Sequence, residues 1–98
     1  ARPRPWLGMY TSEIGAHLVV GGVADDGPAA QAGVEPGDQV AEVAGKPVTT
    51  LAEMFRSIWQ LGPAGTIIPL TIVREGSGSR FELRSADRNQ FLKKPRLH

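Results

Sequence analysis

The sequence predicts a small, mainly β domain with two helices, and three features support this prediction. Residues 28–33 begin with a proline suited to the first position of a helix and end with Gly33, a residue typical of helix stops. Thr50 and Glu53 have the spacing of a capping box and precede an apolar helical pattern that runs to about Leu61. The other apolar residues form short alternating runs between glycines and prolines, as β-strands do.

The strands are expected in five short segments. Residues 11–15 are polar and are expected to connect the first two strands, whereas the Gly/Ser-rich residues 75–79 are expected to form a hairpin loop. Gly21 and Gly22 interrupt the second strand and indicate a bulge or a close backbone approach. The predicted strands are residues 6–10, 17–23, 39–43, 67–74 and 80–85, and the predicted core residues are Leu18, Val20, Val23, Val40, Val43, Ile68, Leu70, Ile72, Phe81 and Leu83.

Length and composition allow one domain with a modest core. The chain has 98 residues, 41% of them hydrophobic, and no cysteine, so its stability must come from packing and hydrogen bonds. The longest uncharged run, residues 57–73, contains glycine and proline and is too short for a membrane-spanning helix, so we expect no membrane insertion. Residues 1–5 have the composition of a linker, and we expect another domain to precede them.

The net charge of +1 hides an uneven distribution. Residues 6–86 hold five basic and nine acidic side chains, whereas the flanks hold six basic and one acidic. The basic tail, residues 87–98, includes Arg88 and the cluster at 93–96. A solvated terminus explains so short a cluster better than a surface for nucleic acid or anionic lipid. Aromatic residues are also not interleaved with the cations, so no nucleic-acid partner is expected.

Catalysis by this chain is not expected. Nucleophilic hydrolysis needs a serine or cysteine beside an oriented base, and the two histidines are His17, in a predicted strand, and His98, the last residue. Ser77 and Ser79 lie in a turn without the spacing of a nucleophile elbow. The sequence contains no metal-ligand cluster, phosphate loop or dinucleotide fingerprint, so neither a metal nor a cofactor is expected.

A family resemblance rests on the segment from Pro28 to Val48. Its order Pro-Ala-x-x-Ala-Gly-x-x-x-Gly-Asp-x-Val, followed by a Gly-Lys-Pro-Val turn, resembles the core signature of bacterial PDZ domains. It is most similar to the PDZ domains of HtrA (Deg-type) serine proteases, and the likeness extends over residues 6–86. Ala44 departs from the pattern, because the family more often has Asn before the turn glycine.

The resemblance implies a fold, a function and a location. The implied fold is a partly open β-barrel capped by two helices, with the bacterial permuted strand order. The implied function is recognition of hydrophobic C-termini or exposed ends of unfolded chains, by a regulatory or substrate-recognition module within a trypsin-like serine endopeptidase. Peptides and the protease domain of the parent chain are then the expected partners, and the bacterial periplasm or cell envelope is the expected location.

The resemblance also implies a peptide-binding site. Trp6, Leu7, Gly8 and Met9 stand where the family has its carboxylate-binding loop, and Gly8 would let successive backbone amides converge on an anion. A peptide would then add as a strand beside residues 9–12. The expected groove residues are Tyr10, Leu51, Phe55, Ile58 and Trp59, whereas Met54 and Leu61 are expected in the core.

Two alternatives remain open at this point. The domain can belong to a protein other than a protease, such as a secretion or membrane scaffold, and would then keep the same groove. It can also be a purely structural domain whose groove is filled by its own tail, in which Phe91 and Leu92 are the apolar residues.

Overall fold

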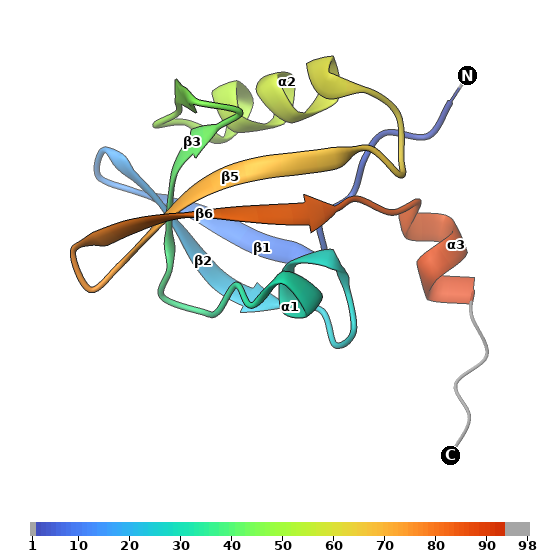
Figure 1. Ribbon diagram of the computed structural model, residues 1–98, viewed down its shortest axis with the longest axis horizontal. Helices are drawn as coiled ribbons and strands as arrows, with labels where there is room; N and C mark the ends of the chain where they lie inside the picture. The colour runs from blue at the N-terminus through green and yellow to red at the C-terminus, as the bar shows by residue number, and fades with distance from the viewer. Residues whose placement is uncertain (1, 94–98) are drawn as a thin grey trace.

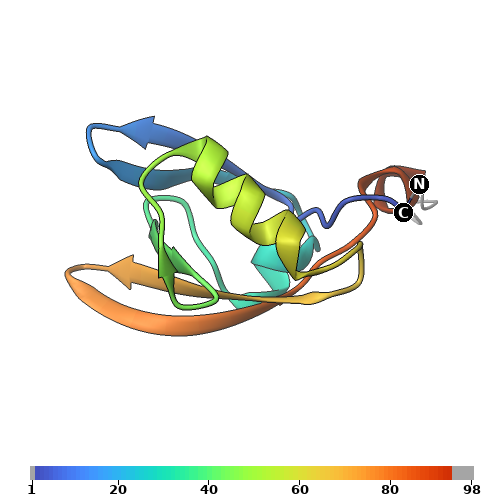
Figure 2. The same ribbon diagram turned by 90° about the horizontal axis from the view of Figure 1, so that it is seen from above.

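The fold is one open sheet with helices on both sides, as seen in a computed structural model that describes residues 2–93. The strand order is β1-β2-β3-β5-β6, all neighbours are antiparallel, and β4 pairs with β3 off this path. Figures 1 and 2 show the curved sheet with α2 and α1 packed against it. The strands are β1 (Met9–Ile14), β2 (His17–Val23), β3 (Gln39–Val43), β4 (Lys46–Pro47), β5 (Ile67–Arg74) and β6 (Ser77–Arg84), and the helices are α1 (Pro28–Ala32), α2 (Leu51–Leu61) and α3 (Arg88–Lys93).

The predicted fold class is confirmed. The sheet does not close, and α1 and α2 lie on opposite sides of it, as a PDZ-like, partly open barrel requires (Figure 1). A third helix, α3, follows the last strand within the segment that the sequence indicated only as a basic tail. Lys94 to Arg96 of the predicted basic cluster lie outside the described residues.

The boundaries of the first strand were predicted wrongly. Residues 6–8 are not a strand, because Gly8 has φ +67° and Trp6 makes only an isolated bridge to Ala86. The strand β1 instead includes residues 11–14, which were expected to be a connection. These residues pair with β2 through a tight turn at Gly15, and Ser12, Glu13 and Ile14 are exposed on the edge strand, so no apolar alternation marks them as a strand.

The last hairpin is also tighter than predicted. The strand β6 begins at Ser77, and only Glu75 and Gly76 form the turn, both with positive φ. Two-residue turns of this kind match the twist of the strands that they join. The first residues of β6 are exposed, so apolar alternation could not reveal them.

The signals for both predicted helices are confirmed. Gly33, with φ +95°, ends α1, and its amide donates to the carbonyl of Ala30. The Thr50 side chain accepts from the Glu53 amide, and the Glu53 carboxylate accepts from the Thr50 amide, so α2 begins with a complete capping box. The helix start is therefore fixed by local chemistry.

The core lies between the sheet and α2. The predicted bulge is confirmed, because Tyr10 pairs with Gly22 and Thr11 with Val20, which leaves Gly21 without a partner residue. Val23 and Phe81 are only half-buried and pack at the edge of the core. The other predicted core residues are buried: Leu18, Val20, Val40, Val43, Ile68, Leu70, Ile72 and Leu83.

Candidate functional site

The segment from Trp6 to Met9 is held by its carbonyl groups. The carbonyl of Leu7 accepts from the amide of Ala29 at 2.9 Å, and that of Gly8 accepts from the amide of Ala24 at 2.8 Å. Trp6 is fixed on the other side by two hydrogen bonds to Ala86. Both carbonyls therefore point toward the chain around α1, and these hydrogen bonds orient the peptide groups that carry them.

The amides of this segment remain available. Within residues 2–93, the amides of Leu7 and Gly8 donate to no protein acceptor. Two successive free amides beside a glycine of positive φ form an anion-binding concavity. A Cβ at Gly8 would also lie 3.1 Å from Cδ of Pro28, so the position needs glycine both for its conformation and for space.

An apolar groove of about 210 Å³ opens beside this segment, between β1 and α2. Among residues 2–93, the strand β1 lies at the edge of the sheet and pairs with β2 alone, so its other edge can pair with an added strand. The groove is lined by Pro5, Trp6, Leu7, Met9, Tyr10, Met54, Phe55, Ile58 and Arg88.

Six of the nine predicted site residues line this groove. Gly8 forms the adjoining loop, whereas Leu51 and Trp59 are absent from the lining. Leu51 is partly buried and packs against the core, and Trp59 stacks on Phe55 with ring centroids 5.6 Å apart. The six that line the groove are Trp6, Leu7, Met9, Tyr10, Phe55 and Ile58.

Sequence reasoning missed three groove residues. Met54 was expected only in the core, but it is both buried and part of the groove floor. Leu61, its expected partner in the core, is 38% exposed. Pro5 and Arg88 lie outside the motifs, and no local pattern indicates that their side chains reach the groove.

A carboxylate joins the two walls at the far end of the site. The Glu13 side chain on β1 accepts from the backbone amide of Leu51, the first residue of α2, at 2.9 Å. That amide is one of the four that no intrahelical carbonyl can satisfy. The contact therefore links the start of α2 to the edge strand.

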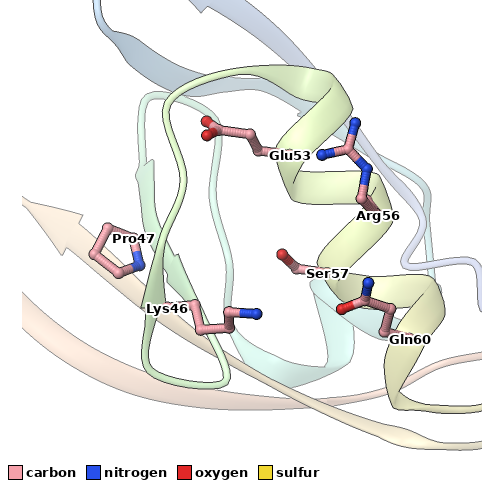
Figure 3. Close-up of a pocket in the computed structure, with 6 residues that line it drawn as sticks. All are labelled: Lys46, Pro47, Glu53, Arg56, Ser57 and Gln60. Atoms are coloured by element: carbon pink, nitrogen blue, oxygen red, sulfur yellow. The ribbon is translucent and has the colours of Figure 1, made fainter.

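The other side of α2 carries a second depression, shown in Figure 3, of about 200 Å³. It lies between α2 and the segment that carries β4. Its lining mixes cations, an amide and a hydroxyl with Glu53, whose carboxylate already caps α2. No apolar wall or buried unpaired group marks it as a binding site. Its residues are Lys46, Pro47, Glu53, Arg56, Ser57 and Gln60.

Comparison with known proteins identifies the class to which this fold and groove belong. The PDZ domain family matches residues 19–74, more than half of the chain, so the chain belongs to the PDZ domain family. The HtrA3 PDZ domain bound to a phage-derived ligand, FGRWV, superposes with a TM-score of 0.72 at 16% identity, over 84% of this chain and 85% of that one. At this identity, the likeness shows that the two chains share a fold.

The curated relatives are proteases. A probable periplasmic serine endoprotease DegP-like of Pseudomonas fulva is 36% identical over 86 residues, 76% of this chain and 18% of that protein. A putative zinc metalloprotease of Brucella suis is 37% identical over 71 residues, 72% of this chain and 18% of that protein. The chain is thus related to HtrA-type serine proteases, and it spans less than a fifth of the length of these relatives.

Proposed function

We propose that this domain binds peptides through a free C-terminus with an apolar last residue. The observation that carries the proposal is the pair of free amides at Leu7 and Gly8 beside an apolar groove. The amides receive the terminal carboxylate, the peptide backbone adds to the free edge of β1, and the last side chain enters between β1 and α2. Main-chain bonds supply affinity and the groove supplies selectivity.

The affinity should be modest. Burial of one apolar side chain contributes about 1.5–3 kcal/mol, and ordering of the peptide offsets part of what the contacts gain. Dissociation constants are therefore expected in the roughly micromolar range. Weak, reversible capture suits a domain that samples many chain ends.

We further propose that the domain serves as a substrate-recognition or regulatory module of a larger serine endopeptidase in the bacterial periplasm. The DegP-like relative, which is named as a probable periplasmic serine endoprotease, supports the proposal. The match to a putative metalloprotease leaves a second parent class open, in which the domain would keep the same groove. The sequence that precedes Ala1 distinguishes them, through a Gly-x-Ser-x-Gly segment or a His-Glu-x-x-His motif.

The groove assignment is tested by charge at its wall. Phe55 lines the groove and is 41% exposed, so Phe55→Asp should leave the fold intact and weaken binding of fluorescein-labelled FGRWV at least tenfold, measured by fluorescence polarisation. Leu61→Asp is the matched control, because Leu61 lies on the same helix, is 38% exposed and is absent from the lining. Equal binding by the two variants would defeat the assignment.

The two apolar residues that the tail-filled alternative depends on do not fill the groove. Phe91 packs on Trp6, with ring centroids 4.9 Å apart, and Leu92 is 55% exposed. Neither side chain lines the groove. The tail residue that does line it is Arg88.

A further inference from the structure

Arg88 is the single charged side chain in the lining of an otherwise apolar groove, among the residues that the structure describes. It belongs to α3, which is separate from the two elements that form the groove walls. The sequence gives no reason to expect it there, since some 80 residues separate it from Trp6 and Leu7. A lone cation in an apolar groove requires an explanation.

Three contacts place the start of α3 beside the loop of free amides. The amide and carbonyl of Ala86 bond to Trp6, both at 2.9 Å, which anchors the chain two residues before Arg88. The carboxylate of Asp87 accepts from the amide of Asn89 at 2.9 Å and so caps α3. Phe91 packs on Trp6 one helical turn after Arg88.

Arg88 therefore points toward the groove from a fixed base. Residues three apart share one face of a helix, so the contact of Phe91 with Trp6 directs Arg88 to the same side. The nearest acidic residue in the chain, Asp87, is already engaged by the amides at the start of α3. The guanidinium forms no ion pair within the described residues.

We propose that Arg88 is a second carboxylate-recognition group, which binds the terminal anion of the peptide together with the amides of Leu7 and Gly8. This inference rests on the proposed function. A carboxylate has about four acceptor sites, and two amides leave some of them unfilled. A guanidinium supplies several donors and a full positive charge, and charge-assisted bonds of this kind favour a free acid over a neutral C-terminus.

The proposal is tested by a comparison of two peptides, FGRWV as the free acid and FGRWV as the C-terminal amide. The Arg88→Gln variant should bind the free acid about two- to fivefold more weakly, the range expected for a solvent-exposed ion pair, and should bind the amide unchanged. Its effect should shrink in high salt, because ions screen such a pair. Arg88→Lys should retain part of the selectivity.

Two further variants separate charge from structure. Arg56→Gln removes a positive charge from α2, on the side of the second depression. It should change neither the affinity for the free acid nor the affinity for the amide. Phe91→Ala removes the contact with Trp6 without a change of charge and should lose part of the free-acid selectivity, because the bonds of Ala86 and Asp87 still hold the start of α3 but its next turn is no longer packed.

The inference is overturned if Arg88→Gln binds the free acid as wild type does, or if it weakens the acid and the amide equally. Equal weakening would mean that Arg88 contacts the peptide without recognising its terminal charge. Failure of the proposed function is a different result, because wild-type protein would then not prefer the acid to the amide at all.

Discussion

At the residue scale, Gly8 carries the strongest constraint in the site. A Cβ there is strained at φ +67° and lies 3.1 Å from Pro28, so Gly8→Ala should destabilise the fold by about 1–2 kcal/mol and weaken peptide binding. Gly15→Ala is the control, since Gly15 has φ +61° in the β1–β2 turn and open space around it. Urea denaturation and polarisation assays should show a loss of stability in both variants and a loss of binding only at Gly8. Equal binding by the two would show that Gly8 does not shape an anion site.

Ala44 is a non-glycine residue at positive φ, and a substitution that tolerates this conformation better should stabilise the domain. It has φ +51° and precedes Gly45 at φ +82°, in a two-residue turn where asparagine tolerates the left-handed conformation better than alanine does. Ala44→Asn should therefore raise the free energy of unfolding by about 0.5–1 kcal/mol. The variant should leave peptide affinity unchanged, because the turn is remote from the groove lining. No change in the urea midpoint would contradict the account of this turn.

At the element scale, local chemistry made some boundaries predictable and others not. The start of α2 follows from a capping box and the end of α1 from Gly33, and both signals are complete within a few residues. The start of β1 was missed because Gly8 leaves the extended conformation, which apolar content alone does not reveal.

The groove shows the same division between local and distant signals. The helical spacing of Phe55 and Ile58 predicted their side of α2, and both line the groove. Arg88 was missed because its place depends on the Trp6–Ala86 bridge, a contact between the two ends of the domain. Met54 was assigned to the core alone, although a groove floor is made by core residues that remain reachable from one side.

The connection between α1 and β3 depends on one ion pair. Buried Asp38 accepts two bonds from Arg74, at 2.8 and 2.7 Å, and a third from the Glu35 amide at 2.8 Å. The Arg74 hydrogen bonds, which outweigh desolvation, lower the pKa of Asp38 below its usual value of 3.8. This contribution to stability is therefore present above about pH 3.8 and is lost as the pH falls toward the lower folded pKa.

Asp38→Asn should remove that dependence. Its free energy of unfolding should be lower than that of the wild type by about 1.5–3 kcal/mol at pH 7, and the difference should shrink below pH 3.8. Urea denaturation from pH 2.5 to 7 measures the difference in free energy of unfolding at pH 7 and its change with pH.

The Glu53 pKa is also lowered, chiefly by the Thr49 amide, but that contribution is common to the wild type and the Asp38→Asn variant. Glu82→Gln, which breaks an exposed pair with Arg80, is the control and should change little. A constant difference across the pH range would contradict this role for Asp38.

At the scale of the whole molecule, residues from both flanks of the domain line the groove together with Trp6 and Leu7. Pro5 lines the groove, Arg4 lies 3.9 Å above the ring of Trp59, and Pro3 accepts a bond from the amide of Ala64. Phe91 and Arg88 approach from the other flank. Pro3, Arg4 and Pro5, which lie in the segment expected to be a linker, thus contact the domain. A peptide in the groove would therefore contact residues of both flanks, Pro5 and Arg88.

The central claim is that free backbone amides receive a terminal carboxylate, and an amide-resolved NMR titration tests it most directly. Addition of FGRWV as the free acid should shift the amide resonances of Leu7 and Gly8 and those along β1, with saturation at roughly micromolar to submillimolar concentration. The C-terminal amide of the same peptide should produce much smaller shifts at Leu7 and Gly8 and bind more weakly. Equal affinity for the two peptides, or shifts that bypass Leu7 and Gly8, would contradict the account.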